Sequence, residues 1–500
     1  MRSSALPGAR GSRRPRPLRS RPLRCRVRGR IPLGQAALRA GPRAIPDAAQ
    51  LQPRGGERGL TLPDGEYYSE IEVMPRRELE ELQLRMLRAI VRRAYHESPF
   101  HGRRLRARGV APDDVDSFDD FRRMVPIYTK DDLRREMSGD NMDWILGAEQ
   151  PISLYSLTSG TTGVNTVLAL NYGFLDEIVE RLFMRQFWMA KLRPGMTAFQ
   201  VLAGWHFLGL ATNMAFSRIG VRAVAPWGTS IHDYVGEFVE SLLRWRPEYF
   251  VGMPWMVDAM IEEGRRRGID PAELFRGVKY LHLAGEPITP GYARKLLDET
   301  GVRDVFDAGG SADGIWGGSD CEHHSGIHAW MDVNFLEVVD PRTLEPLDYG
   351  ERGRWVSTLL IPGGPTVLRY LGDDLVSIEK ERCECGRTHY SVHIYDRVGN
   401  SFTRNGRLLT PYDISLALEA VCGHRLFTVL NPESSGDTIR LLVARDGDDD
   451  GCEGASEEIY REFLRRFGVG VEVRWVDVRE LPFSHRKLIR VYRDEGGDAA

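Results

Sequence analysis

The chain has 500 residues, more than one hydrophobic core usually supports, so we expect two or three domains. Its net charge is −3 and 42% of its residues are apolar. No apolar run approaches the ~18 residues that a membrane-spanning helix needs, and the N-terminus lacks the apolar core of a signal peptide. Six cysteines are too few for a disulfide scaffold in a chain of this length. These features predict a cytoplasmic protein without a membrane span.

The first 60 residues differ in composition from the rest. They are a mixture of Arg, Pro, Gly and Ala in which the only acids are Asp47 and Glu57. Such a segment buries too little apolar surface to offset the entropy lost on ordering. We interpret residues 1–60 as a disordered basic arm or as sequence upstream of the true start, with a transit peptide as the third alternative. The remaining residues are acidic, which argues against nucleic-acid binding.

Order is expected from about Tyr67 onward. Residues 77–91 place leucine, methionine and isoleucine at helical spacing, which predicts an amphipathic helix. Several short helices are expected from there to about residue 137.

From 150 to 310, strand-like apolar runs alternate with helical runs, which predicts an α/β fold with a mainly parallel sheet. Expected strands are 197–203, 221–225, 248–252, 278–284 and 303–307. Expected helices are 173–190, 208–218, 232–246, 254–267 and 289–300.

The pattern changes twice in the last third of the chain. From 332 to 395 the expected strands are closer together and linked by turns, as in an antiparallel unit. After Arg397, expected strands at 426–430, 438–444 and 471–476 and a helix at 455–467 follow. This part predicts a small α+β domain.

The stretch from Tyr155 to Thr166 is rich in hydroxyls and glycines and lies between two apolar runs. It predicts a strand, a tight loop and a second strand. Glycines allow close approach of the backbone to a ligand, and amides with hydroxyls can surround a phosphate. No Gly-Lys-[Ser/Thr] sequence closes the loop, so it is not a Walker loop. By itself the loop fits phosphate binding and an ordinary polar turn equally well.

Several motifs occur in an order that resembles the adenylate-forming superfamily, and specifically the phenylacetate–CoA ligase family. The resemblance covers about residues 67–493. Its elements are Ser98-Pro99-Phe100, Pro126 to Leu133, Thr158 to Thr166, Ala284-Gly285-Glu286-Pro287, Gly309 to Asp313, Cys321-Glu322, Gly326 to Asp332, Leu368 to Leu375, Asp396 to Asn400 and Pro482 to Lys487. Each motif alone is weak, but all of them in order are a strong signal for the fold.

The resemblance implies a large adenylation domain of several subdomains (61–396) and a small mobile α+β lid domain (397–500), hinged near Arg397. In the implied reaction a carboxylate attacks the α-phosphate of ATP, giving an acyl-adenylate and pyrophosphate. CoA then displaces AMP. The expected partners are therefore a small carboxylic acid, ATP, Mg²⁺ and CoA. Homodimers are common in the family, and the sequence does not decide between monomer and dimer.

The resemblance also places the site residues. Lys487 would neutralise the carboxylate and α-phosphate as they meet, Asp313 would bind Mg²⁺, and Asp374 would hold the ribose hydroxyls. The alternatives are a surface lysine for Lys487 and a solvated loop acid for Asp374. The other nucleotide-binding residues are expected to be Ser159, Gly160, Thr161, Thr162, Gly163, Gly285, Glu286, Pro287, Asp307, Gly310, Ser311 and Arg397.

An acyl pocket is expected after the ends of the sheet strands, where ligand sites of α/β proteins gather. Three tryptophans suggest a flat aromatic acid, with ordinary core packing as the alternative for any single aromatic. The expected lining is Trp205, His206, Phe207, Trp227, Met253, Pro254 and Trp255.

Cys321, His328, Cys383 and Cys385 form a second constellation, with His389 nearby. Three thiols and one imidazole suit a closed structural zinc site. The alternative is a set of reduced cysteines in a region of β-hairpins.

The chain departs from the family pattern at several positions. Val164-Asn165 replace the Lys-Pro of the phosphate loop, so one cation is missing there. Further departures are Gly309 for tyrosine, Ala312 for a hydroxyl residue, Asp313 for glutamate, Gly399 or Asn400 for the hinge acid and Arg486 for glycine. Two alternatives follow: an adenylating enzyme that passes the acyl group to an amine or a carrier-protein thiol, and a non-catalytic nucleotide- or acyl-binding relative.

Overall fold

The computed structural model of the chain describes residues 65–137, 152–157, 167–202, 206–225, 231–434, 438–445, 452–484 and 487–493. Residues 1–60, the predicted arm, lie outside this description. Within the described ranges, no helix has both the length and the apolar composition needed to cross a membrane.

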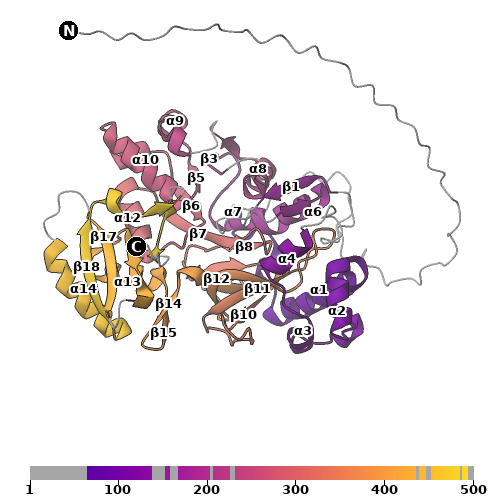
Figure 1. Cartoon of the computed structure of the whole chain (residues 1–500). Helices are drawn as coiled ribbons and strands as arrows, with labels where there is room; N and C mark the ends of the chain where they lie inside the picture. Colours follow the sequence, from indigo (N-terminus) through magenta and orange to yellow (C-terminus); the bar gives the residue numbers. More distant parts are fainter. Residues whose placement is uncertain are drawn as a thin grey trace, which may run out of the picture. The chain divides into compact units, whose positions relative to one another are not determined.

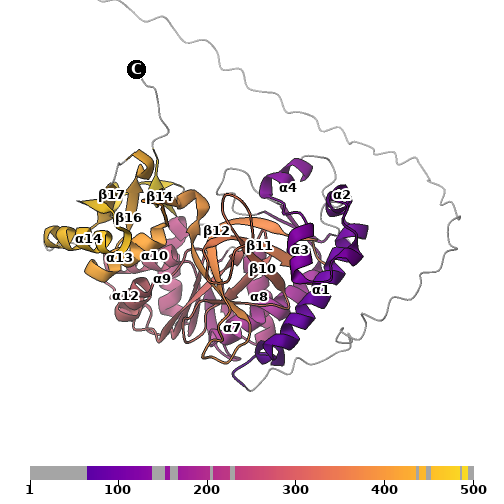
Figure 2. The ribbon, with the colours of Figure 1, turned by 90° about the horizontal axis from the view of Figure 1, so that it is seen from below.

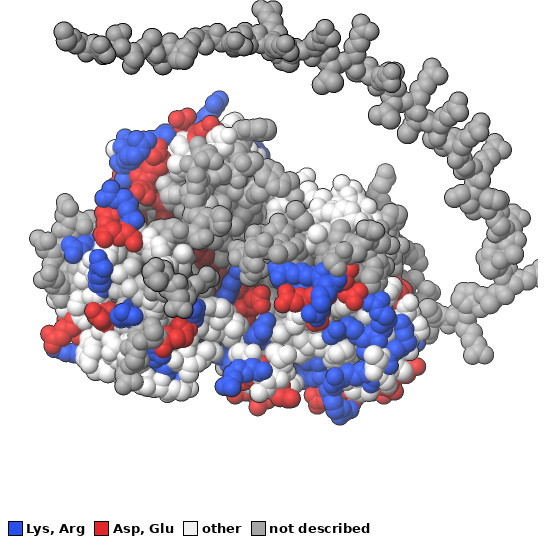
Figure 3. Space-filling model, viewed as in Figure 1, with Lys and Arg blue, Asp and Glu red and all other residues white. Residues whose placement is uncertain are grey.

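Helices dominate the described residues before 138. They are α1 (Arg76–Glu97), α2 (Pro99–Ala107), α3 (Phe118–Met124) and α4 (Lys130–Met137). α1 contains the helix predicted for 77–91. It ends at Glu97. The next residue, Ser98, is extended because a proline follows, and it caps α2 by accepting a hydrogen bond from the His101 amide at 3.3 Å. Acidic and basic side chains alternate over these helices (Figure 3), and some are paired, as Arg88 is with Asp116 at 2.9 Å.

An eleven-stranded sheet forms the centre of the structure, in the order β10-β11-β12-β13-β9-β8-β7-β6-β5-β3-β4 (Figure 1). From β4 through β3, β5 and β6 to β7 the strands run parallel. From β7 to β10 neighbours run antiparallel. The strands are β3 (Thr197–Gln200), β4 (Arg222–Val224), β5 (Tyr249–Gly252), β6 (Tyr280–Ala284), β7 (Asp304–Ser311), β8 (Trp316–Ser319), β9 (Ile327–Ala329), β10 (Asn334–Val339), β11 (Gly353–Leu359), β12 (Tyr370–Glu379) and β13 (Tyr390–Arg397).

The prediction of mainly parallel sheets is therefore correct for only half of this sheet. The five strands predicted between 150 and 310 give the parallel half. The antiparallel unit predicted for 332–395 is formed by β10 to β13. It belongs to the same sheet as the parallel strands, because β13 pairs with β9, with Tyr390 opposite Ala329. Periodicity identifies strands, but it does not show which distant strands pair.

The two faces of the parallel half are covered by different helices, as alternating side chains require. Phe199 and Phe250 pack with α9 and α10 on one face. Their neighbours Ala198 and Tyr249 pack with α8 on the other. The predicted helix 173–190 is continuous but contains a π-helical segment. The helices are α6 (Tyr172–Ile178), the π-helix η4 (Val179–Met184), α7 (Arg185–Met189), α8 (Phe207–Ile219), α9 (Ile231–Trp245), α10 (Pro254–Arg266), α11 (Pro271–Leu274) and α12 (Pro290–Thr300).

The chain after Arg397 forms a four-stranded sheet in the order β18-β17-β16-β21, with a hydrophobic core of its own that extends from Phe402 to Val491. The predicted strands and the predicted helix are all present. Figures 1 and 2 both show α13 next to α12. The elements are β14 (Phe402–Arg404), β15 (Arg407–Leu409), α13 (Pro411–Cys422), β16 (Phe427–Leu430), β17 (Thr438–Ala444), α14 (Cys452–Phe467), β18 (Gly470–Val476), β19 (Phe483–Ser484), β20 (Lys487–Leu488) and β21 (Val491–Tyr492).

Candidate functional site

The strands on either side of the predicted phosphate loop are formed as expected. β1 (Leu154–Leu157) pairs antiparallel with β2 (Val167–Leu170), and Leu157 lies opposite Val167 at the base of the loop. The buried hydroxyl of Ser156 accepts a hydrogen bond from the Phe207 amide at 3.1 Å, which connects β1 to the start of α8. The loop residues Ser159, Gly160, Thr161, Thr162, Gly163, Val164 and Asn165 lie outside the described residues.

Asp313, the predicted magnesium ligand, lies in the turn after β7. Its Oδ2 is 3.0 Å from Nζ of Lys130 in α4, and the two side chains are only 15% and 16% exposed. The Tyr370 hydroxyl approaches the same oxygen at 3.5 Å. Oδ1 of Asp313 is buried and has no hydrogen-bond partner among the described atoms. A buried carboxylate oxygen without a partner suits a cation, so Asp313 fits the predicted role.

Lys130 is a candidate that the sequence analysis did not single out. It is the first residue of α4. It lies within Pro126 to Leu133, a stretch that was noted only for its resemblance to the family. The predicted phosphate loop has Val164-Asn165 where the family has lysine and proline, and Lys130 places a cation beside Asp313. Local sequence could not show this, because the pair joins residues that are far apart in the chain.

Asp374 and Arg397 lie opposite each other in β12 and β13. Arg397 Nε is 3.8 Å from Asp374 Oδ1, and the Trp355 indole donates to Oδ2 at 3.1 Å. Burial raises the pKa of Asp374, although the hydrogen bond from Trp355 and the charge of Arg397 act in the opposite direction. Because 26% of the Asp374 side chain is exposed, its carboxylate can still accept hydrogen bonds from ligand hydroxyls.

The predicted nucleotide residues at the carboxyl ends of β6 and β7 adjoin one another. Gly285 has φ +94°, which favours glycine, and it leads through Glu286 and Pro287 toward α12. Asp307 accepts a hydrogen bond from the Ile288 amide at 3.4 Å, which connects β7 to this segment. Burial raises the pKa of Asp307 well above its usual range.

One glycine of β7 is required by close packing against backbone, and side chains fill the space beside a second. A Cβ at Gly310 would lie 2.2 Å from the Trp316 carbonyl oxygen, so no larger residue fits. At Gly309, where the family commonly has tyrosine, a Cβ would lie 2.4 Å from Ile327 Cδ1 and 2.5 Å from Ile394 Cδ1. Two isoleucines therefore occupy the space beside Gly309. The predicted site residue that follows, Ser311, accepts a hydrogen bond at 3.3 Å from the amide of Gly314.

The residues predicted to line the acyl pocket are only partly within the described structure. Trp205 and Trp227 lie outside it. His206 caps α8, because its Nδ1 accepts the amide of the second helical residue at 3.3 Å. Phe207 is buried and packs edge-on against Phe183, with ring centroids 5.9 Å apart, as a core residue does.

Met253 and Trp255 lie at the start of α10, at the carboxyl end of β5. The Trp255 indole nitrogen is 3.3 Å from Met253 Sδ. A Cβ built on Gly285 would be 3.7 Å from Met253 Cγ. Predicted acyl-binding and nucleotide-binding residues therefore meet at this end of the sheet.

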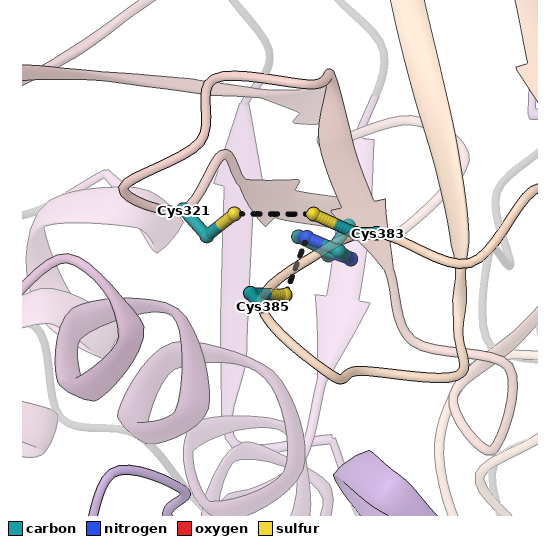
Figure 4. Close-up of side chains that lie close together, drawn as sticks. Cys321, Cys383 and Cys385 are labelled. Carbon is teal, nitrogen blue, oxygen red and sulfur yellow. Dashed lines mark hydrogen bonds between the residues drawn. The ribbon is translucent and has the colours of Figure 1, made fainter.

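The predicted metal ligands converge (Figure 4). Cys321 follows β8, His328 lies in β9, and Cys383 and Cys385 lie in the turn between β12 and β13. The Sγ atoms of Cys321 and Cys383 are 3.6 Å apart, and Cys385 Sγ is 3.5 Å from His328 Nε2. All four ligand atoms lie within 4.8 Å of one another. Zn–S bonds of ~2.3 Å in a tetrahedron place sulfurs roughly 3.8 Å apart, so the arrangement fits zinc.

A segment before α1 packs on the cysteine turn. Tyr67 donates a hydrogen bond to the Cys385 carbonyl at 2.8 Å. Glu72 and Arg387 form a fully buried ion pair at 2.8 Å. His389, which we placed near the metal ligands, instead accepts from the Met331 amide at Nδ1 and lies 3.0 Å from a backbone carbonyl at Nε2. It supports the turn through backbone contacts.

Lys487 lies in β20, which pairs with β19 in a short hairpin. Its side chain lies outside the described structure, as do His485 and Arg486. Three residues after Lys487, the Arg490 guanidinium is 3.7 Å from the Glu286 carboxylate. The strand that carries the predicted catalytic lysine thus leads directly to the predicted nucleotide element.

Comparisons with known proteins found a matching family model and several relatives. A family model described as "AMP-binding enzyme" matches residues 130–369. A phenylacetate–coenzyme A ligase of Thermus thermophilus is 30% identical over 441 residues, which are 86% of this chain and 93% of that protein. A phenylacetate–coenzyme A ligase of Aromatoleum evansii is 27% identical over 314 residues, which are 62% of this chain and 68% of that protein.

A solved structure supports the fold. The crystal structure of a 2-hydroxyisobutyryl-CoA ligase in the postadenylation state, in complex with 2-HIB-AMP, matches with a TM-score of 0.78 and 24% identity. The match covers 88% of this chain and 95% of that chain. At this identity the likeness concerns the mixed α/β fold with its large and small sheets.

Proposed function

The chain belongs to the adenylate-forming superfamily of AMP-binding enzymes, and on that premise we propose that it is an ATP-dependent acid–CoA ligase for an aromatic carboxylic acid of the phenylacetate type. The observation that carries the proposal is the pairing of Asp313, in the turn after β7, with Lys130 of α4, and of Asp374 in β12 with Arg397 in β13. A non-catalytic relative that kept only the fold would need neither pair. Both pairs suit a nucleotide, with cationic and metal-binding groups for phosphates and a carboxylate for ribose.

In the first half-reaction a substrate carboxylate oxygen forms a bond to the α-phosphorus of ATP. The bond from the α-phosphorus to the bridging oxygen breaks, and its electron pair leaves on pyrophosphate. Such a displacement depends on positioning and charge neutralisation. Mg²⁺ bound with ATP would neutralise phosphate charge, and Asp313 would hold it. Lys130 and Lys487 would add two cations, and Asp374 would fix the ribose.

In the second half-reaction the CoA thiol loses its proton and its sulfur attacks the acyl carbon. The bond from that carbon to the phosphate oxygen breaks, and AMP leaves with the electron pair. The lysine of β20 has to withdraw to admit the thiol, which a hinge near Arg397 would permit. The division into domains 61–396 and 397–500 is part of this proposal.

We propose a purely structural zinc ion for Cys321, His328, Cys383 and Cys385. The four protein ligands would complete its tetrahedron and leave no position for a substrate. The ion would hold the β8–β9 and β12–β13 turns together.

Pyrophosphate release over a panel of carboxylic acids, with and without CoA, tests the proposal. We expect release with phenylacetate-like acids and a thioester product when CoA is present. CoA-independent release without a thioester would favour transfer to an amine or a carrier-protein thiol. No release with any acid, alongside normal ATP binding, would favour a non-catalytic relative.

A further inference from the structure

The C-terminal part of the chain contacts the large sheet through the N-terminus of α12. Glu419 of α13 lies against this helix, and its side chain is only 8% exposed. Its Oε2 accepts a hydrogen bond from the Gly291 amide at 3.0 Å, and its Oε1 accepts one from the Thr289 hydroxyl. His424 Nδ1 lies 3.0 Å from Oε1. A carboxylate at this position satisfies helix donors that have no partner within α12 and complements the helix dipole.

The contact with Glu419 depends on the absence of a side chain at Gly291. A Cβ there would lie 2.3 Å from Glu419 Cδ and 2.6 Å from Oε2. Gly291 is not among the glycines with positive φ, so alanine suits its backbone. Glycine is otherwise unfavourable within a helix by about 1 kcal/mol relative to alanine. The missing side chain therefore serves the approach of Glu419.

Two further contacts also join the C-terminal part to the part of the chain before Arg397. The Arg352 guanidinium, just before β11, is 2.8 Å from the Asp413 carboxylate in the first turn of α13. Arg490 is 3.7 Å from Glu286 in the nucleotide element. α13 is thus held at both ends, and β20 with Lys487 precedes the Arg490 contact by three residues.

We infer that Glu419 is a positioning residue for the first half-reaction. By seating on the N-terminus of α12, it holds the C-terminal part in the arrangement that carries the Lys487 strand to the nucleotide site. The second half-reaction, in which that lysine withdraws, does not need the contact. The expected kinetic effect rests on the proposed acid–CoA ligase function. The contact between Glu419 and α12 does not depend on that function.

Three variants test it: Glu419→Ala, Gly291→Ala and the double variant. Each single change should slow acid-dependent ATP–pyrophosphate exchange about tenfold, because the charge-assisted contact is lost or blocked. Thioester formation from a preformed acyl-adenylate should keep its rate. The double variant should be no slower than Glu419→Ala, because the three atoms nearest to the added methyl group all belong to the part of the Glu419 side chain that this change removes. Additive losses, or equal losses in both half-reactions, would overturn the inference.

Matched controls separate the contact from general damage. Gly454→Ala adds the same methyl group to α14, where nothing lies within 4 Å of its Cβ, and Glu458→Ala removes an exposed glutamate of the same helix. Both should leave both half-reactions unchanged.

Hydrogen exchange of the Gly291 amide tests the contact without any activity. We expect faster exchange in Glu419→Ala and in Gly291→Ala than in the controls. Unchanged exchange would overturn the contact. If the native protein shows no pyrophosphate exchange with any acid, the proposed function fails, and the amide measurement still decides whether the contact holds.

Discussion

The Cys–His cluster and the proposed nucleotide site both adjoin the eleven-stranded sheet but are built differently. The four ligand side chains of the cluster come from turns and a strand and are almost completely buried, and Glu72 and Arg387 form a buried ion pair beside them. The nucleotide site takes its groups from α4, the β7 turn, β12 and the C-terminal β20, and its phosphate loop lies outside the described residues. We infer that the cluster contributes to stability and the nucleotide site to rate, and the predictions below test this division.

The largest effect is expected at Lys487. Lys487→Ala should slow adenylation at least about a hundredfold, because it removes a cation needed only as the carboxylate meets the α-phosphate, and a loss of ~2.7 kcal/mol of transition-state stabilisation has that size. The midpoint of thermal unfolding should not change, because β20 is a two-residue strand. Single-turnover pyrophosphate release and calorimetry measure the two quantities.

Lys380→Ala is the matched control for Lys487. Lys380 lies 4.8 Å above the Tyr349 ring, in the segment after β12. Its replacement should leave the adenylation rate unchanged. A slowing of less than about tenfold in Lys487→Ala would show that the assignment of this lysine is wrong.

Disruption of the Cys–His cluster should lower stability without changing ATP binding. Cys385→Ser, or removal of metal by a chelator, should lower the unfolding midpoint by about 5 °C or more, because a structural zinc site contributes directly to folding free energy. The fraction that stays folded should keep the wild-type KM for ATP. Metal analysis should find about one zinc per chain in the native protein, as one four-ligand site requires.

Cys422→Ser provides the comparison for the cluster. The Cys422 thiol donates to the Leu418 carbonyl within α13 at 3.3 Å and lies outside the cluster. This variant should keep both zinc and stability. A zinc content below about half an equivalent in the native protein would contradict the metal site.

Asp374 should affect ATP binding more than the chemical step. Asp374→Asn should raise the KM for ATP about tenfold, because an amide accepts fewer hydrogen bonds from ribose hydroxyls than a carboxylate does. Burial raises the pKa of Asp374, so protonation on acidification should weaken ATP binding at a higher pH than for an exposed aspartate. The native KM should therefore rise as the pH falls through that raised pKa, and Asp374→Asn should lack this dependence. An identical pH profile in both proteins would refute the ribose role.

The sequence predicted the elements better than their pairing. The strands around the predicted phosphate loop follow from local residue types, because turn chemistry is a local property. The four cluster ligands are far apart in the chain, but they could be predicted because cysteine and histidine are the usual ligands of structural zinc. The join of the two half-sheets at β9 and β13 was not predictable, because it depends on strands distant in the chain. Lys130 and Glu419 were missed for the same reason. Each looks like an ordinary surface charge until the fold places Asp313 or α12 beside it.

Lys130 gives the smallest expected effect and the sharpest test of the division between rate and stability. Lys130→Ala should slow adenylation about tenfold, because the loop with Val164 and Asn165 supplies no lysine of its own and a single cation near a phosphate is worth ~1.4 kcal/mol or more. Lys191→Ala is the control, since it breaks another partly exposed ion pair, in which Lys191 lies 3.1 Å from Glu322, the residue after the cluster ligand Cys321. If Lys130→Ala lowered the unfolding midpoint as much as Cys385→Ser and left adenylation unchanged, Lys130 would be structural. The cation missing from the loop would then have no replacement in α4.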